Sequence, residues 1–219
     1  MCGTRIHRQA PWQQGSSIVK GRRIVERVNL LSVDIYTTTL DFKGGDVHHE
    51  VFAYGRPVPG EYSEEHKTHT YYEDLVLKDT PLMREVKTVI EEEASEVLSK
   101  EYKVSAMWGL VLQKGESVEP HSHKSNSHLN PHEYFSVAYY PTAGFDDAQL
   151  VFGVPYANSQ ETVTHIQPTA GMLVIFPSYL THWTTRQMSN TRVVLSANVE
   201  PVEPETNTQQ NWSAYDFNQ

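Results

Sequence analysis

Seven short apolar segments, separated by turns rich in glycine and proline, follow one another along the chain after residue 104. They span residues 106–113, 133–140, 149–154, 162–167, 172–176, 181–185 and 192–199. Short strands at this spacing are typical of β-sandwiches and jelly rolls, because glycine and proline break regular elements into short runs. The chain has 219 residues, a length that one all-β domain can use without dividing. We therefore predict a mainly β fold of the jelly-roll type.

A flanking helix is expected before these strands, from Thr80 to about Lys100. Thr80 can cap the helix, and Pro81 suits the first helical position, where its missing N–H costs nothing. Apolar residues then recur with helical periodicity at Leu82, Met83, Val86, Val89, Ile90, Ala94, Val97 and Leu98. Such a helix has one apolar face, which we expect to pack on the outside of the sheet.

The remaining segments differ in composition. Residues 1–23 are polar and aperiodic and are interpreted as an N-terminal arm, and residues 201–219 as a polar C-terminal tail. Residues 24–37 contain the β-branched residues of one or two strands, whereas 41–73 are expected to be loops with short strands. A single jelly-roll domain over residues 24–200 follows, with the arms available for a homo-oligomer or a larger assembly.

Composition limits the partners and the location. The formal net charge of −9 disfavours binding to phosphate backbones, so no nucleic acid partner is expected. Cys2 is the one cysteine, which excludes a disulfide within the chain and a cysteine-based metal site. No segment approaches the ~20 apolar residues of a membrane span, and the start lacks the apolar run of a signal peptide. We expect no membrane partner and a cytoplasmic location, or the host cytoplasm if the protein is viral.

Three histidines and one arginine carry the candidate chemistry. His121 and His123 follow a strand and the Gly115 turn, and residues i and i+2 of an extended segment face the same side. His182 follows an apolar strand, and imidazole suits iron, zinc, copper and nickel. Arg192 opens the last strand, where a buried guanidinium can bind a carboxylate through two parallel hydrogen bonds. The alternative role for each histidine is that of a core residue without a metal. The alternative role for Arg192 is that of a partner in a structural ion pair.

The order of these motifs resembles that of a phage and bacterial family of 2-oxoglutarate/Fe(II)-dependent oxygenases. Over roughly residues 75–200, four segments are similar to motifs of that family: Trp108 with Gly115 and His121-x-His123; Phe-Ser136-Val-Ala-Tyr139-Tyr140; Gly171 to Pro177 followed by His182; and Arg192 with Ser196 and Asn198. The resemblance implies a double-stranded β-helix, the cupin-like form of the jelly roll. It also implies Fe(II) and 2-oxoglutarate as cofactors and hydroxylation of a peptide or small molecule.

Site residues follow from the same resemblance. It implies iron on His121 and His182, with His123 at a position where many relatives carry a carboxylate. It implies that Arg192 binds the distal carboxylate of 2-oxoglutarate. Ser136 and Tyr140, four residues apart on one strand face, would line the cosubstrate pocket.

Two departures from the family pattern leave alternatives open. The usual iron site is two histidines and one carboxylate, so the centre is either all-histidine or is completed by a residue such as Glu133. Residues 124–133 look like an insertion that adds His128 and His132 as extra ligands, a lid or solvated residues. The substrate-facing segments are expected at 41–73 and 124–133. Competing functions are a cupin-type metalloenzyme with a three-histidine site and a non-catalytic phage or virion assembly component.

Overall fold

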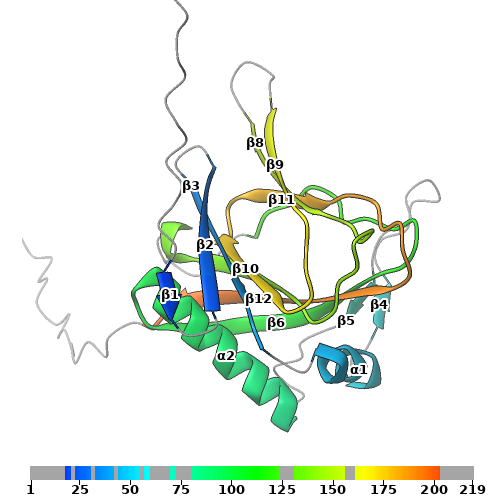
Figure 1. Ribbon diagram of the computed structural model, residues 1–219, viewed down its shortest axis with the longest axis horizontal. Helices are drawn as coiled ribbons and strands as arrows, with labels where there is room; N and C mark the ends of the chain where they lie inside the picture. The colour runs from blue at the N-terminus through cyan, green and yellow to red at the C-terminus, as the bar shows by residue number, and fades with distance from the viewer. Residues whose placement is uncertain are drawn as a thin grey trace, which may run out of the picture.

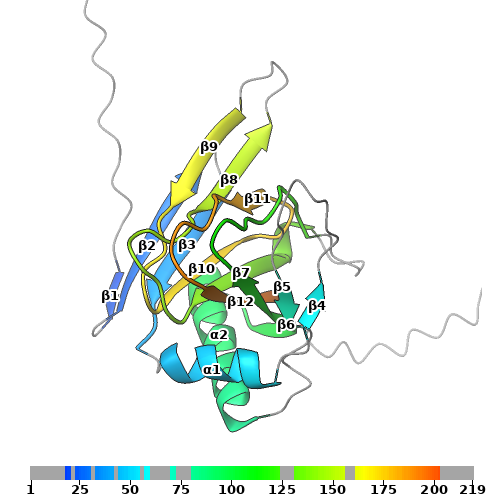
Figure 2. The same cartoon turned by 90° about the vertical axis from the view of Figure 1, so that its right-hand side faces the viewer.

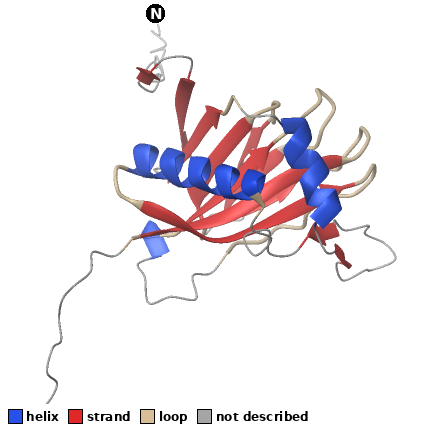
Figure 3. Cartoon of the chain, turned by 90° about the horizontal axis from the view of Figure 1, so that it is seen from below, coloured by secondary structure: helices blue, strands red, loops and turns tan. Residues whose placement is uncertain are grey.

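Two antiparallel sheets packed face to face, with helices on the outside of the larger one, form the molecule (Figures 1 and 3). The computed structural model describes residues 18–20, 23–30, 33–41, 44–54, 57–59, 70–72, 80–123, 131–155 and 161–202. Within them the larger sheet has the order β1-β2-β3-β10-β7-β12-β6-β5-β4, and the smaller sheet has the order β11-β8-β9. The arrangement is that of a double-stranded β-helix, which confirms the predicted fold class.

Most strands match the apolar segments of the sequence. Their bounds are β1 (Ile18–Lys20), β2 (Arg23–Leu30), β3 (Val33–Thr39), β4 (Pro57–Pro59), β5 (Thr70–Tyr72), β6 (Tyr102–Leu112), β7 (Phe135–Tyr140), β8 (Leu150–Pro155), β9 (Glu161–Ile166), β10 (Met172–Pro177), β11 (Thr181–Thr184) and β12 (Arg192–Pro201). Strands β8 and β9 pair antiparallel and extend together away from the rest of the fold (Figures 1 and 2). β11 pairs along the other side of β8.

The central strands of the larger sheet contribute side chains to two separate hydrophobic cores. Alternate side chains of a strand point to opposite faces, so each strand serves both. On β12, Val193 and Leu195 pack toward the helix layer, whereas Val194 packs toward the smaller sheet. On β7, Tyr139 belongs to the helix side and Tyr140 to the space between the sheets. The second core surrounds the candidate site.

One extra residue in β6 shifts its alternation. Asn198 of β12 pairs with Ala106, and Val199 pairs with Val104, so Ser105 is left without a partner in the ladder. Such a β-bulge changes the parity of the residues that face each side. Val104 faces the helix layer before the bulge, and after it Trp108 lines the cavity between the sheets.

Helix α2 (Pro81–Leu98) confirms the predicted helix. The backbone N–H of Met83 donates to the Thr80 hydroxyl at 3.1 Å, which satisfies one free donor of the first turn. Its buried residues, Met83, Val86, Ile90, Glu93 and Ala94, lie on one face. The helix covers the larger sheet (Figure 3). None of the described helices is long and apolar enough to cross a membrane.

The structure corrects the expectation for part of the N-terminal half. Residues 44–54, predicted as loop, form a second helix, α1 (Gly44–Tyr54). Val47 and Val51 lie four residues apart and are fully buried in the same core as α2, which explains why this segment is helical. The predicted short strands of this region are present as β4 and β5, and residues 24–37 contain β2 and β3.

Boundaries differ at two other places. The strand expected at 133–140 begins at Phe135, because Pro131–Glu133 forms a 3-10 turn, η2, that starts with a proline. The predicted arm ends as strand β1, which pairs with β2. Residues 1–17 and 203–219, the rest of the arm and nearly all of the tail, lie outside the described residues. The single domain over 24–200 stays a prediction.

Candidate metal centre

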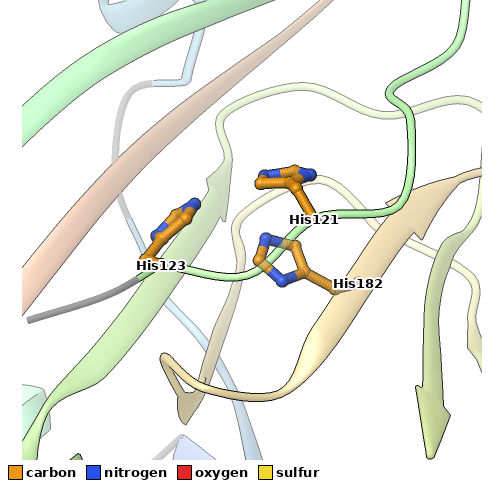
Figure 4. A group of neighbouring side chains, drawn as sticks. All are labelled: His121, His123 and His182. Carbon is orange, nitrogen blue, oxygen red and sulfur yellow. The ribbon is translucent and has the colours of Figure 1, made fainter. Parts of the chain in front are cut away.

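Three histidines from two distant stretches meet between the sheets (Figure 4). The ligand atoms of His121, His123 and His182 all lie within 4.8 Å of one another. Two imidazole nitrogens bound to one ion at about 2.1 Å are at most about 4 Å apart, so small ring rotations would bring all three onto a single ion. The structure thus brings together the three residues that the sequence predicts as ligands.

Main-chain hydrogen bonds set the positions of these histidines. His121 and His182 form an antiparallel bridge, in which the His121 N–H donates to the His182 carbonyl at 3.0 Å and the His182 N–H donates back at 2.8 Å. Directly opposed residues of an antiparallel pair present their side chains on the same face. The N–H of His123 donates to the Ser178 carbonyl at 2.8 Å, which fixes the end of the same segment.

Each of the three rings has its Nδ1 atom next to a protein oxygen. The Nδ1 of His121 lies 2.8 Å from the Glu119 carbonyl, and that of His182 lies 3.0 Å from the Leu180 carbonyl. The Nδ1 of His123 lies 2.9 Å from the Asn198 Oδ1 atom. A carbonyl oxygen only accepts hydrogen bonds, so Nδ1 carries the proton in each ring. The lone pair is then on Nε2, which leaves three Nε2 atoms as the candidate metal ligands.

Burial keeps the rings of His182 and His123 neutral. It lowers the pKa of His182 to about 3, with a further contribution from the neighbouring His121. Burial also lowers the pKa of His123, although its hydrogen bond to Asn198 opposes the shift. Neutral imidazole is the form that binds a metal ion, because a protonated ring has no free lone pair. Both residues are therefore in the ligand form at neutral pH.

Arg192 lines the same cavity and has hydrogen-bond donors to spare. The side chain is 1% exposed, and its Nη1 donates to the Ala148 carbonyl. Its Nε and Nη2 atoms are buried without a hydrogen-bond partner, and its guanidinium lies 5.4 Å from the centre of the Tyr140 ring. A buried cation with unsatisfied donors is costly unless an anion pairs with it. The arrangement is therefore suited to a carboxylate that accepts two hydrogen bonds.

Opposing effects act on the charge of Arg192. Burial lowers the pKa of the guanidinium, whereas Tyr140 and Asp147 raise it. In turn, burial raises the pKa of the Tyr140 phenol to about 12, although Arg192 opposes the shift. Because arginine starts from a very high pKa, the side chain remains a cation in the cavity.

The two remaining predicted cosubstrate residues take different places. Tyr140 lines the cavity with Arg192 and the histidines. Ser136 is fully buried beside the metal centre and is not among the residues that line the cavity. Its hydroxyl lies 2.9 Å from Nδ1 of His123 and 2.7 Å from the Ser178 hydroxyl. Ser136 therefore contacts His123, and its proposed place in a cosubstrate pocket stays a prediction.

The candidate carboxylate Glu133 and the extra histidine His132 lie outside the group of three histidines. Glu133 forms an ion pair with Lys100 at 2.8 Å, because the η2 turn directs it toward the end of α2. His132 is exposed, with its ring centre 5.4 Å from that of Tyr179. His128 lies outside the described residues. Among the described residues, the group of metal ligands consists of histidines.

Gln187, which sequence reasoning missed, is connected to Arg192 through the main chain of Ala148. Gln187 is fully buried, and its Oε1 accepts a hydrogen bond from the Ala148 N–H at 2.8 Å. Its Nε2 donates to Asp147 at 2.6 Å. The Ala148 carbonyl in turn accepts from Arg192, so the main chain of Ala148 links Gln187 to the guanidinium. Gln187 lies between β11 and β12, outside any regular element, so the sequence has no periodic pattern that would mark it as buried.

Comparison with known proteins finds one matching family model and several solved structures of similar fold. Residues 106–198 match a family model described as "Putative 2OG-Fe(II) oxygenase". A search of the curated proteins finds no match to the sequence.

Several solved structures resemble the chain at low sequence identity. The non-heme alpha ketoglutarate dependent epimerase SnoN from nogalamycin biosynthesis is 13% identical, with a TM-score of 0.65 over 76% of this chain and 78% of that chain. HygX from Streptomyces hygroscopicus, with nickel and 2-oxoglutarate bound, is 11% identical, with a TM-score of 0.59 over 78% and 84%. A Pseudomonas putida prolyl-4-hydroxylase is 12% identical, with a TM-score of 0.55 over 77% and 93%. At these identities the likeness shows the fold, which all three share with this chain.

Proposed function

We propose, on the premise that residues 106–198 belong to the 2OG-Fe(II) oxygenase family, that the chain is a non-haem Fe(II)- and 2-oxoglutarate-dependent dioxygenase of the hydroxylase type. The observation that carries this proposal is the pair of unpartnered donors on buried Arg192, in the same cavity as three converging histidines. The family's cofactors are Fe(II) and 2-oxoglutarate, as its description states.

The residues present fit both cofactors. His121, His123 and His182 would hold the iron through Nε2, since imidazole suits Fe(II) and three protein ligands leave coordination positions open. The Nε and Nη2 atoms of Arg192 match the two oxygens of a carboxylate. Iron with bound 2-oxoglutarate supplies the oxidation of an unreactive C–H bond, which protein side chains alone do not perform.

The chain's own residues bind and shield the reactants. Arg192 would orient the distal carboxylate of the cosubstrate, with Tyr140 packed beside the guanidinium. Leu110, Leu150 and Val194 make much of the lining apolar, which excludes water and strengthens the contacts of Arg192. Preorganised donors of this kind position the cosubstrate without further rearrangement.

The substrate is proposed only as a class, a peptide or a small molecule. Similar structures include an epimerase from nogalamycin biosynthesis and a prolyl-4-hydroxylase, which differ in what they act on. The segment 124–130, one of the predicted substrate-facing regions, lies outside the described residues. A cupin-type enzyme and an assembly component find no support in the comparisons. A cytoplasmic location, a phage or bacterial source and a homo-oligomer stay predictions.

The experiment that tests the function is anaerobic reconstitution. Fe(II) and then 2-oxoglutarate are added to the purified protein, and the weak visible charge-transfer band of a chelated 2-oxoacid is recorded. The band should appear in the wild type and be lost in Arg192→Ala and His182→Ala. Arg186→Ala, which removes an exposed arginine, serves as the control and should keep the band. A folded wild-type protein that gives no band would refute the proposal, and metal binding without the band would favour the cupin alternative.

A further inference from the structure

A closed network of hydrogen bonds surrounds the outer nitrogen of His123. Asn198 Oδ1 lies 2.9 Å from Nδ1 of His123, and the Ser136 hydroxyl also lies 2.9 Å from it. The Ser136 hydroxyl lies 3.1 Å from Asn198 Oδ1 and 2.7 Å from the Ser178 hydroxyl. Ser136 and Ser178 are each 1% exposed. The network therefore lies in the interior, where an unsatisfied polar group is costly.

The hydrogens in this network have one consistent arrangement when His123 carries its proton on Nδ1. The Nδ1–H and the Ser136 O–H both donate to Asn198 Oδ1, which has two lone pairs. The Ser178 O–H then donates to the Ser136 oxygen. The hydrogens on His123 Nδ1, Ser136 and Ser178 then each have an acceptor, and Nε2 of His123 is left with its lone pair free.

The network connects His123, at the end of its described segment, to two strands of the larger sheet. Asn198 and Ser136 are directly opposed on β12 and β7, two central strands of the larger sheet. His123 belongs to neither sheet ladder, and its ring also lies 5.4 Å from the centre of the Trp108 ring. His121 and His182 differ, because each of their Nδ1 atoms faces a carbonyl two residues earlier in its own segment. His123 alone among the three depends on side chains of other elements.

We propose that Asn198, assisted by Ser136, is a positioning residue that makes His123 a working third metal ligand. The inference rests on the metal centre of the proposed function and extends it to the position where a carboxylate is usual. Asn198 fixes the tautomer and the orientation of the imidazole, and Ser136 fixes the Asn198 amide with its oxygen toward the ring. Outer partners of this kind typically change metal affinity by 10- to 100-fold.

The test compares Co(II) affinity, by optical titration, for wild type, Asn198→Leu, Asn198→Asp and Ser105→Ala. Leucine removes the acceptor and should weaken binding by roughly 10- to 100-fold. Aspartate keeps an acceptor for Nδ1–H, so this variant should bind at least as well as the wild type. Ser105 lies 3.3 Å from the main-chain oxygen of Asn198 and does not touch its side chain, so Ser105→Ala should leave affinity unchanged. Asn198→Leu with wild-type affinity would overturn the proposal.

A second measurement needs no metal. Nitrogen NMR of the metal-free protein should find His123 protonated at Nδ1 in the wild type and a mixture of tautomers in Asn198→Leu. If Asn198→Leu does not fold, Ser136→Ala replaces it in both measurements and should show a smaller loss in the same direction. A wild type that binds no divalent ion would refute the proposed function, and the tautomer would then decide the positioning role alone. An unchanged tautomer in a folded variant would refute that role.

Discussion

Replacing Arg192 with methionine should separate ligand binding from stability. Methionine removes the charge and keeps a flexible apolar side chain of similar length in a largely apolar cavity. We expect the ligand-free variant to unfold at nearly the same free energy as the wild type, or at a higher one. We expect its affinity for 2-oxoglutarate to fall by several orders of magnitude.

The magnitudes follow from the contacts of Arg192. The wild type gives up several kcal/mol by burying an unpaired cation, which methionine recovers. Against this, the variant loses the hydrogen bond to Ala148, about 1.5–3 kcal/mol, and the contact with the Tyr140 ring, about 0.5–2 kcal/mol. These contributions nearly cancel. Two charge-assisted bonds to a carboxylate, about 1.5–3 kcal/mol each, correspond to a loss of roughly 10²- to 10⁴-fold in affinity.

The assay is urea denaturation with and without 2-oxoglutarate, in the presence of Mn(II) to avoid oxidation. At a ligand concentration of about 100 times the wild-type Kd, the wild type should gain about 2.7 kcal/mol, and Arg192→Met should gain at most about 0.4 kcal/mol. Arg186→Met changes an exposed arginine and should behave as the wild type. A metal-free Arg192→Met protein that loses more than about 3 kcal/mol yet still binds 2-oxoglutarate would refute the reasoning and make Arg192 a structural partner of Asp147.

Three further changes have expected outcomes, each measured by urea denaturation of the metal-free protein. Gly171→Ala should cost at least about 1–2 kcal/mol, because Gly171 has a φ of +79° and an added Cβ would lie 2.7 Å from the main-chain oxygen of Leu40. Gly115→Ala, at a φ of +91° with nothing within 4 Å, is its control and should cost only the backbone strain, so equal losses would contradict the close approach. Thr80→Ala should lower the free energy of unfolding by about 1 kcal/mol, because it removes the cap of α2. Thr80→Ser keeps the hydroxyl and should be as stable as the wild type, so an equal loss in both variants would argue against capping. Burial lowers the pKa of His182 from 6.5 to about 3, so on acidification the unfolded chain takes up a proton before the folded protein does. The free energy of unfolding should therefore fall as the pH drops below about 6.5, by up to ~1.4 kcal/mol per pH unit. His182→Gln should reduce this slope, and an unchanged slope would count against a buried neutral ring.

Much of the fold could be predicted from short sequence patterns, because caps, apolar repeats and turn glycines act on the backbone close to them in the chain. The cap at Thr80 and the repeating apolar face were enough to predict α2, and the turns at Gly115 and Gly171 mark real ends of strands. Helix α1 was missed because Val47 and Val51 are the two fully buried apolar residues among its described side chains, within a segment rich in histidine and glycine. The Ser105 bulge was missed because a single extra residue does not disturb an apolar run.

The candidate site was predictable in its members but not in their partners. The spacing of His121 and His123 and the place of His182 indicated a shared site, and the structure brings them together. The family resemblance implied a cosubstrate role for Ser136. It gave no sign of the contact between the Ser136 hydroxyl and His123, which lies 13 residues earlier in the chain. Main-chain acceptors and contacts over long sequence separations leave no trace in a motif.

The pairing of His121 with His182 has a consequence for how such a site can diverge. Their positions are set by two main-chain hydrogen bonds, which do not depend on the side chains that the two residues carry. A mutation at either position would therefore remove a ligand and leave the two segments joined. Chemistry and architecture can then change at different rates: a lineage is free to exchange ligands, or to lose catalysis altogether, on a scaffold that continues to fold.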